Sequence, residues 1–585
     1  MKRYFIPLMF AAAILTTGCE SKLDIPQKGV VAYEDFYKTD EDAEGAMAAA
    51  YDIFTQNIAR PNGESIICPY IALFNLPGDD VYAAGEFYGD NDFNGEINEF
   101  RFDSNTQLVV SMYKGFYQMI YGANLVIDNF AGDKANSEVK KRVVAEARTM
   151  RAWAHMMLAI GWGAAPLVDH VLVESPSNSS SQEDLLLWCA NEASEAQADL
   201  RERSSKTDKN GTTYMTKGFA QYVAGKSYLF AGKFAEAKAA LKPLVESDKY
   251  ELVPGNRIRE TFHLAGEGNE EIIFAANVNN NPNIGDWNGK IQKTVWMHMD
   301  IWGWRMDHCA GKPLSVQGGW GGLGVRADFA EDLIANDGYN SARRQAWVKQ
   351  FDPEILYTMD YAHDGADTRG YIKSINGTDT TWTANKAEDI QRGITSYMYG
   401  QSEYLQYKRV SDAADYDNWY STLNVLVARL AEAYLMYAEA CARTSDNDGL
   451  QYLNKIQNRA GSNTVSGTLT LDDVKSEKRF EMFMEGCRWA DLVRYARQDN
   501  DQTVYEKLGH NGEDVPQIYD KLFVNPDGGA LSTQHEIVTV MQHPNAGKKV
   551  GFQKGNHRKR SLRTSRKRQL SGSRYCRNYN ACNKA

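Results

Sequence analysis

Apolar and small residues recur along most of this chain at intervals of three and four, the spacing of one face of an α-helix. Strict alternation of apolar and polar residues, typical of a half-buried strand, is short and rare, as at residues 271–274. The pattern therefore predicts a mainly α fold with few short strands. The predicted helical stretches are residues 43–54, 108–130, 138–158, 184–200, 216–246, 425–443 and 471–497.

One of these stretches carries the pattern of small and large residues that is typical of a tetratricopeptide helix pair. Gly225 would let two helices approach, Tyr228 would fill the gap, and Ala231-Gly232-Lys233 would form the turn between them. Residues 431–450 give a second, looser copy. Such helix pairs predict a scaffold and by themselves indicate no activity.

The helical pattern breaks twice, at residues 77–103 and 279–324, into glycine, asparagine, aspartate and aromatic residues. Irregular segments of this length in a compact protein are usually functional or disordered. The aromatic content of both segments argues against disorder. They are therefore the predicted long irregular loops that carry the functional site.

The second irregular segment is rich in tryptophan. The first contains aromatic residues that would form a second wall of the same binding site. Indole rings stack on the apolar faces of sugars, while amide and carboxylate groups bond the hydroxyls, so the composition suits a glycan platform. For any single tryptophan the alternative is an ordinary core position. The predicted ligand-binding residues are Trp287, Trp296, Trp302, Trp304 and Trp320, with Tyr82, Tyr88 and Asn91 on the second wall.

The first irregular segment also matches half of a calcium-binding loop. Asp90, Asp92 and Asn94 stand at alternate positions, and a glycine follows at the turn. The twelfth position is Arg101 instead of the bidentate glutamate, so the predicted calcium site is incomplete. A solvated turn rich in Asp and Asn is the competing interpretation, and no other cofactor is indicated.

The N-terminus has the form of a bacterial lipoprotein signal. Lys2 and Arg3 precede a short apolar run, and Gly18-Cys19 follows it where the lipobox places the acylated cysteine. The run is too short to cross a bilayer, which needs roughly 20 apolar residues. We therefore expect residues 1–18 to be removed and Cys19 to be lipidated, which anchors the protein to a membrane; an ordinary signal with an accidental cysteine is the alternative.

The net charge of −11 conceals two different regions. Residues 548–585 contain 13 Lys and Arg and no acidic residue, so the preceding body carries about −24. An acidic body argues against nucleic acid as a partner.

The cysteines are scattered without a CxxC pair, so neither a disulfide framework nor a zinc site is predicted, and Cys441 and Cys487 are expected in the core.

Carboxylates beside arginines offer the only hint of acid–base chemistry. Glu485, Arg488, Asp491 and Arg494 follow one another at intervals of three, which predicts alternating charges on a helix surface. Arginines so placed would keep the carboxylates ionised, so we interpret this cluster, and likewise Glu146 with Arg148, as a structural ion network. No nucleophile, phosphate-binding or metalloprotease motif is found, so no catalytic residue is predicted.

A series of weak motifs, specific when taken in this order, resembles the SusD-like or RagB-like nutrient-binding lipoproteins of Bacteroidetes. The motifs are Leu23-Asp24-Ile25-Pro26, Phe36-Tyr37-Lys38-Thr39-Asp40, Gly122-Ala123-Asn124-Leu125, Ala145-Glu146-Ala147-Arg148, Gly163-Ala164-Ala165-Pro166, Arg429-Leu430-Ala431-Glu432, Arg459-Ala460-Gly461 and Glu485-Gly486-Cys487-Arg488-Trp489.

The resemblance implies a SusD-like α-α superhelix over residues 19–556, built on tetratricopeptide-like helix pairs. It further implies a lipid-anchored protein on the outer-membrane surface of a Gram-negative bacterium, which captures an oligosaccharide or polysaccharide for a TonB-dependent transporter of the SusC type. The family is not one of enzymes. Two alternatives stay open: an α-helical glycoside hydrolase or lyase, with carboxylates roughly 5 to 10 Å apart in a cleft, and a peptide-binding repeat scaffold.

The resemblance fails in the basic tail, residues 557–585. Family members usually close with a Pro-x-Pro segment, whereas this chain runs His557-Arg558-Lys559-Arg560. A frameshift near His557 is our hypothesis; a basic arm that touches anionic lipopolysaccharide is the alternative.

Overall fold

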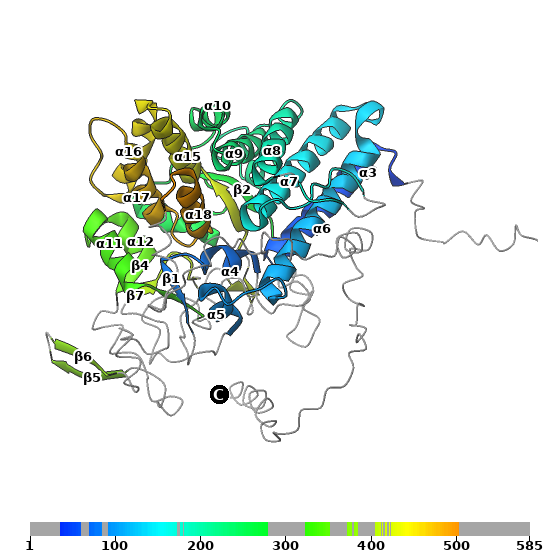
Figure 1. The fold of residues 1–585 in the computed structure, drawn as a ribbon. Coiled ribbons are helices and arrows are strands. Elements are labelled where there is room, and N and C mark those ends of the chain that lie inside the picture. Colours follow the sequence, from blue (N-terminus) through cyan, green and yellow to red (C-terminus); the bar gives the residue numbers. More distant parts are fainter. Residues whose placement is uncertain are drawn as a thin grey trace, which may run out of the picture.

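The structure is a computed structural model that describes residues 36–59, 69–84, 92–171, 176–179, 181–278, 322–350, 404–410, 412 and 423–501, with the strand segments 371–376, 379–383, 416–417 and 420–421. Helices dominate this part of the chain, which confirms the predicted mainly α class (Figure 1). They are α3 (Asp40–Ala59), α4 (Pro69–Asn75), α5 (Asp92–Asn98), α6 (Gln107–Phe130), α7 (Glu138–Trp162), α8 (Gln182–Ala196), α9 (Lys217–Phe230), α10 (Phe234–Val245), α11 (Ala327–Asp337), α12 (Ala342–Trp347), α15 (Leu430–Arg443), α16 (Leu450–Ala460), α17 (Leu471–Glu481) and α18 (Arg488–Gln498), with short 3₁₀ helices η2 (Gly132–Lys134), η3 (Asn210–Thr212), η4 (Gly255–Phe262), η5 (Leu264–Gly266) and η8 (Asn447–Gly449).

The strands of the described residues form five two-stranded antiparallel sheets, so strand content is low, as predicted. The pairs are β1 (Val81–Ala83) with β3 (Leu323–Val325), β2 (Ile272–Ala276) with β10 (Val425–Arg429), β4 (Val348–Gln350) with β7 (Tyr404–Gln406), β5 (Tyr371–Asn376) with β6 (Asp379–Thr383), and β8 (Tyr416–Asp417) with β9 (Tyr420–Ser421).

Consecutive helices pack side by side in a continuous row. Helix α3 packs on α6, and the row continues through α7, α8, α9 and α10 to α15, which in turn contacts α16 and α17. Figure 1 shows this row above, with α4, α5, β1 and the β4–β7 sheet below it. One cluster of buried apolar side chains runs through the row and includes both Ala43 and Ala496.

The predicted tetratricopeptide-like pair is present as α9 and α10. A Cβ atom on Gly225 would lie 2.3 Å from Cγ of Leu241, so only glycine permits this approach. Gly232 makes the turn between the helices with φ of +74°, a left-handed conformation that favours glycine. The close helix–helix contact that the spacing of small residues predicted is therefore confirmed.

Two predicted helical stretches are interrupted. Residues 425–429 form strand β10 instead of the start of a helix, because this segment pairs with the buried strand β2 and its Val-Leu-Val composition suits a sheet. The stretch 471–497 is two helices, α17 and α18, separated by a turn in which Met484 and Gly486 have positive φ.

Contacts from distant residues end helix α17. The carbonyl oxygen of Glu481 accepts hydrogen bonds from Lys408 Nζ at 3.0 Å and from Arg429 Nη2 at 2.9 Å. These cations satisfy a carbonyl group that the helix leaves without an internal partner at its end. The local pattern could not predict this break, since both donors lie more than 50 residues away in sequence.

The charge ladder predicted on one helix surface is largely wrong. Glu485 precedes α18 and pairs with Arg429, while Arg488 pairs with Asp79. Within the helix, only Asp491 and Arg494 form the expected pair, at 2.9 Å, and both are buried. The residues are structural ion pairs, as interpreted, but they join separate elements inside the protein.

Two smaller predictions concern the core and the membrane. Cys441 and Cys487 are buried and unpaired, as expected of core residues. Among the helices in the described part of the chain, none is both long and apolar enough to cross a bilayer.

Candidate functional site

The two irregular segments predicted to carry the site meet at the β1–β3 sheet. Tyr82 of β1 faces Gly324 of β3 in the ladder, and the Ala84 amide donates to the Gly322 carbonyl oxygen at 3.0 Å. Ala84 and Gly322, the last described residue of one segment and the first of the other, are therefore hydrogen-bonded neighbours. Residues about 240 positions apart in sequence thus pair in one two-stranded sheet.

A buried asparagine holds β1 in place. The Asn98 side chain accepts from the Ala83 amide at 3.1 Å and donates to the Leu76 and Val81 carbonyl oxygens at 2.7 and 3.3 Å. Asn98 ends helix α5, so this one amide ties α5 to both ends of the short strand. A three-residue strand would be marginal alone, and these bonds fix its position.

Tyr82 is the predicted ligand residue whose surroundings are described most fully. It is half-buried; Arg326 Nη1 donates to its hydroxyl at 3.0 Å, and the guanidinium carbon lies 4.9 Å from the ring centroid. Arg326 is itself held by Asp328, at 2.7 Å. Burial raises the pKa of Tyr82, and the nearby Arg326 opposes that rise. The ring is thus a neutral aromatic group in a fixed orientation.

An acidic pair attaches this sheet to the helical row. Arg488 binds Asp79 with two hydrogen bonds of 2.5 and 2.7 Å, and Arg479 Nε binds Asp80 at 2.8 Å. Burial and the adjacent Asp79 raise the pKa of Asp80 to about 6. Burial acts in the same direction on Asp79, but Arg488 outweighs it and lowers that pKa to about 2. These pairs join the start of β1 to α17 and α18.

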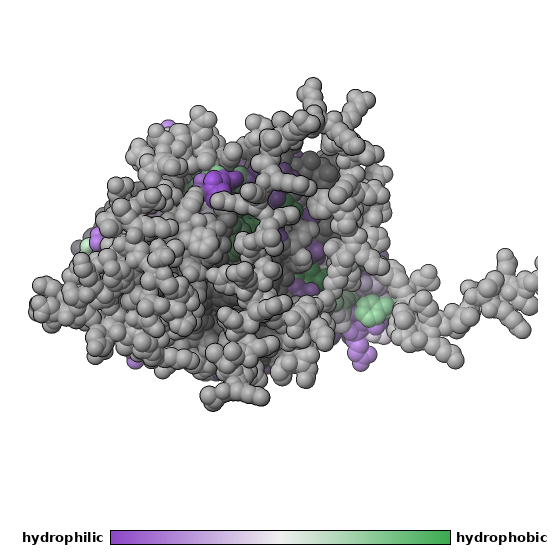
Figure 2. All heavy atoms as spheres, turned by 90° about the horizontal axis from the view of Figure 1, so that it is seen from below, coloured by the Kyte–Doolittle hydropathy of each residue, from purple (hydrophilic) through white to green (hydrophobic). Residues whose placement is uncertain are grey.

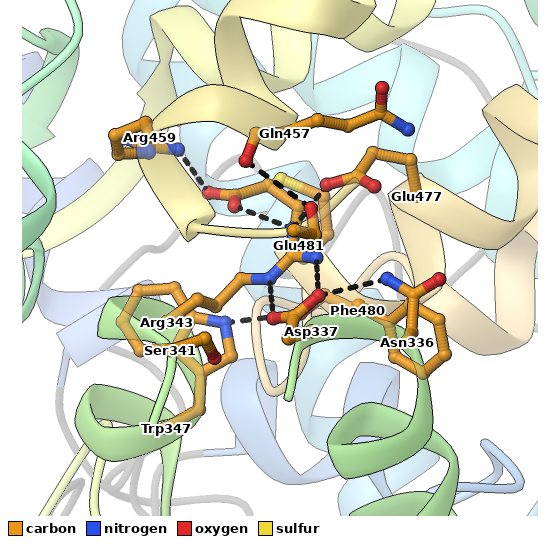
Figure 3. A network of polar contacts seen from close by, with 12 residues as sticks. Asn336, Asp337, Ser341, Arg343, Trp347, Gln457, Arg459, Glu477, Phe480 and Glu481 are labelled. Carbon is orange, nitrogen blue, oxygen red and sulfur yellow. Dashed lines mark hydrogen bonds and ion pairs between the residues drawn. The ribbon is translucent and has the colours of Figure 1, made fainter. Parts of the chain in front are cut away.

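A second ion network lies deeper, between α12, α16 and α17 (Figure 3). Arg343 is fully buried and binds Asp337 at 2.7 Å, together with Glu477 and Glu481. Glu481 also binds Arg459 at 2.6 Å. Although burial works against it, the surrounding arginines hold the pKa of Glu481 well below its usual range.

The carboxylates of Glu485 and Asp491, which offered the hint of acid–base chemistry in the sequence, are occupied in the same way. Glu485 binds Arg429 at 2.6 Å and Lys408 at 2.5 Å, and Asp491 binds Lys478 at 2.8 Å. A glycosidase acid must carry a proton near neutral pH. Arg429 and Lys408 lower the pKa of Glu485 despite its burial, so this carboxyl stays ionised. The arrangement is suited to a rigid frame and not to proton transfer.

Only part of the predicted site falls within the described residues. Tyr82 and Asn94 are described, and Asp92 only by its backbone, at the start of α5. The other predicted residues lie outside the described residues: Cys19, Tyr88, Asp90, Asn91, Trp287, Trp296, Trp302, Trp304 and Trp320.

Of the three residues predicted to bind calcium, the structure describes the side chain of Asn94 alone. Asn94 is buried, and its amide donates to the Gly322 carbonyl oxygen at 3.4 Å, so this side chain joins α5 to the chain before β3. Over the ranges that the structure describes, no group of three or more His, Cys, Asp or Glu side chains is arranged to hold a metal. Calcium binding at Asp90, Asp92 and Asn94 stays a prediction.

Sequence reasoning missed three residues that organise this sheet, namely Asn98, Arg326 and Asp79. Asn98 and Arg326 carry no motif, since their partners are fixed only by the folded chain. The acidic dipeptide Asp79-Asp80 directly before an apolar strand was a visible signal.

Figure 2 views the molecule from below; the described side chains visible there form small hydrophobic and hydrophilic areas and no single apolar patch.

Comparison with known proteins gives consistent family matches. Residues 272–545 match the model described as "SusD family", and residues 82–209 match the model described as "Starch-binding associating with outer membrane". A "SusD-like protein" of Bacteroides ovatus is 25% identical over 518 residues, which are 85% of this chain and 83% of the relative. The "Starch-binding protein SusD" of Bacteroides thetaiotaomicron is 23% identical over 569 residues, 89% of this chain and 96% of the relative.

Solved structures share the fold. The surface glycan-binding protein A of Bacteroides thetaiotaomicron, solved in complex with laminarihexaose, superposes with a TM-score of 0.65 at 18% identity over 86% of this chain and 98% of that one. A laminarin-binding SusD-like protein gives a TM-score of 0.62 at 20% identity over 83% of this chain and 96% of that one. At these identities the likeness establishes the architecture.

Proposed function

The chain belongs to the SusD-like family, and from that premise we propose that it is a glycan-binding lipoprotein of the outer membrane. It captures an oligosaccharide or polysaccharide at the cell surface and delivers it to a TonB-dependent transporter of the SusC type. Relatives whose names state a ligand bind starch, laminarin or laminarihexaose, all of them glucose polymers. A glycan is accordingly the proposed ligand class.

The observation that carries the proposal is the β1–β3 sheet. It brings the start of the Tyr82–Asn91 wall next to the end of the tryptophan-rich segment, at the bonded pair Ala84 and Gly322. This bonded pair supports the proposal that both segments contribute to one site. Rigid aromatic groups beside amide and carboxylate groups are the chemistry that binds sugars without reacting with them.

The protein is proposed to bind glycan without cleaving it. The inner carboxylates of the described residues are used by arginines and lysines in the frame, as at Glu481 and Glu485. The relatives named above are SusD-like or glycan-binding proteins. The hydrolase alternative would be supported if purified protein released product from a bound glycan and lost this activity on mutation of one carboxylate.

Titration calorimetry with laminarihexaose and maltohexaose, on the full chain without its signal and with Cys19→Ala, tests the proposal. Trp296→Ala, Trp302→Ala, Trp304→Ala and Trp320→Ala are each measured for affinity and for melting temperature. Loss of one stacking ring should weaken binding roughly tenfold, since a well-placed aromatic contact contributes about 1 kcal/mol or more. A ligand residue loses affinity at an unchanged melting temperature, whereas a core residue loses stability.

Tyr214→Ala is the matched control, because Tyr214 is an exposed tyrosine stacked on Arg201 between η3 and α9. It should leave affinity unchanged. If all four tryptophan variants only destabilise, and Tyr88→Ala also binds normally, the site lies elsewhere. Absence of binding to every glycan on an array would contradict the proposed function itself.

The anchor and the partner are proposals with their own tests. Cys19 is the proposed lipid attachment site, and co-purification from outer membranes tests the SusC-type transporter as partner. If the transporter is absent from material purified under mild detergent, delivery to it is contradicted. Calcium at Asp90, Asp92 and Asn94 is tested by a rise in melting temperature on addition of calcium that EDTA reverses.

A further inference from the structure

Exposed Tyr339 and buried Arg344 form an aromatic and cationic pair after the end of helix α11. Helix α11 ends at Gly338, whose φ is +87°, and the chain turns through Tyr339 into α12. Ser341 caps α12 by accepting a hydrogen bond from the Arg344 amide at 3.2 Å. The Arg344 guanidinium carbon then lies 3.9 Å from the centroid of the Tyr339 ring.

The two consecutive arginines of α12 have opposite surroundings. The Arg343 guanidinium is fully buried and satisfied by Asp337, Glu477 and Glu481. Arg344 is only 6% exposed, yet its Nε and Nη2 atoms have no hydrogen-bond partner. These two nitrogens form the edge that binds a carboxylate through two parallel bonds elsewhere in this protein, as Arg488 does with Asp79.

Among the described residues, Arg344 is the only arginine with two buried guanidinium nitrogens that lack a hydrogen-bond partner. Arg201 stacks on Tyr214 at 3.9 Å and donates Nε and Nη2 to Glu146. Arg259 stacks on Tyr407 at 3.8 Å and donates to Asp412 and to backbone carbonyl groups. In both cases the stacked guanidinium group also pairs with a carboxylate of the described chain. At Arg344 no residue that the structure describes supplies one, and an unsatisfied buried cation is costly.

The exposed ring of Tyr339 indicates the chemistry of a ligand that would pair with the Arg344 guanidinium. Tyr339 is 49% exposed, the highest value among the large apolar side chains of the described residues. Its ring offers a stacking face, and because the Nε and Nη2 atoms of Arg344 are buried, a ligand group reaches them only when the surrounding side chains move aside. A ligand that carries an apolar ring face and an attached carboxylate satisfies both residues.

We propose that Tyr339 and Arg344 are a subsite for a uronic acid residue, so that the captured glycan is acidic at this position. The inference rests on the proposed glycan-binding function and names a substrate class for it. Helix α11 begins two residues after β3 and spans about 16 Å at 1.5 Å per residue, so the subsite lies about one helix length from the β1–β3 sheet. It extends the binding surface of a chain-like ligand.

A carboxylate from a partner protein fits the pair less well. Stable protein interfaces bury about 800 Å² on each partner around an apolar centre. The exposed large apolar residues of the described chain are Tyr214, Leu264 and Tyr339, which lie on separate elements. A single ring beside a single cation matches one sugar residue better than it matches a protein surface.

The test compares trigalacturonic acid with the neutral laminarihexaose on the full mature chain. Arg344→Gln should weaken trigalacturonate binding about tenfold or more, because a charge-assisted bidentate contact is lost, and should leave laminarihexaose binding unchanged. Tyr339→Ala should weaken the acidic sugar severalfold. Arg257→Gln is the charge-matched control: it removes one positive charge from an exposed arginine on η4 and should change neither affinity.

Stability separates a binding role from a structural one. Arg344→Gln removes an unsatisfied buried cation, so its melting temperature should equal or exceed that of the wild type. A lower melting temperature with equal losses for both sugars would mean that Arg344 supports the fold, and would overturn the proposal.

Two further outcomes would overturn the subsite. One is a wild-type chain that binds neither galacturonate, glucuronate nor mannuronate oligomers while it still binds a neutral glycan; the proposed function then survives without the subsite. The other is an Arg344→Gln variant that keeps full uronate affinity but no longer co-purifies with the transporter. That result would assign the arginine to a carboxylate of the protein partner.

Discussion

Substitution of Glu481 by glutamine tests whether the deep ion network holds the fold together. The Glu481 carboxylate is fully buried and binds Arg429 at 2.7 Å, Arg459 at 2.6 Å and Arg343 at 3.2 Å. The amide keeps the size and one acceptor oxygen of the carboxylate but removes its charge. Three buried arginines then share one negative charge fewer.

The expected cost follows from the chemistry of buried pairs. Removal of one partner from a buried ion pair destabilises a protein by about 3–5 kcal/mol, because the remaining charge is uncompensated. The retained oxygen still accepts one hydrogen bond, which places Glu481→Gln near the lower end, at about 3 kcal/mol. For a large domain each kcal/mol lowers the melting temperature by roughly 2 °C, so a drop of about 6 °C is expected.

Urea unfolding and thermal scans of Glu481→Gln measure this drop against a matched surface variant. Glu138→Gln removes the same charge from an exposed pair, in which Glu138 binds Lys141 at 2.9 Å with its side chain 90% exposed. That pair should contribute less than about 1 kcal/mol.

A double variant isolates the network itself. Arg459→Gln combined with Glu481→Gln should cost less than the two single changes added together, because the paired charges leave together. If Glu481→Gln melts no lower than Glu138→Gln, or if the two network changes are simply additive, the network does not stabilise the fold in the way argued.

The remaining predictions concern acid stability, helix packing and anchoring. Burial alone would raise the pKa values of Glu432 and Glu439, but neighbouring cations lower both to about 2. Their unfolded value is near 4.3, so the stability that they add above this pH should fall as pH drops from about 4.5 to 2, and Glu439→Gln should flatten that decline in acid titrations followed by circular dichroism. Gly225→Val should unfold at lower temperature by several degrees, since its Cβ would meet Leu241 at 2.3 Å, whereas an unchanged melting temperature would show that α9 and α10 can separate at little cost. Cys19→Ala should move the protein from the membrane fraction to the soluble fraction, and retention of the variant at the membrane without its transporter would contradict the lipid anchor.

The sequence predicted well those features that depend on neighbours along the chain. Helices such as α6 and α7 were placed nearly to their ends, because an apolar stripe at helical spacing is a local signal. The turn at Gly232 and the close approach at Gly225 were predicted for the same reason. Each depends on a residue type at a fixed offset, which one sequence displays.

Features that depend on distant residues were missed. The break after Glu481 requires Arg429 and Lys408 at its carbonyl oxygen, and neither residue is close in sequence. Strand β10 was taken as helix because its valines also fit a helical stripe until β2 pairs with them. The site was located by composition, yet Asn98 and Arg326, which fix the β1–β3 sheet, have no local signal.

Charge in this protein divides between frame and binding surface. Arginines such as Arg343 and Arg429 pair with buried carboxylates. These ion pairs join α12, α17 and the β2–β10 sheet. These pairs fix the frame. The β1–β3 sheet attaches to this frame through the pairs Asp79–Arg488 and Asp80–Arg479. A chimaera that carries residues 85–91 and 279–321 of a relative keeps every residue of these buried pairs, and we expect it to acquire the relative's glycan preference at an unchanged melting temperature.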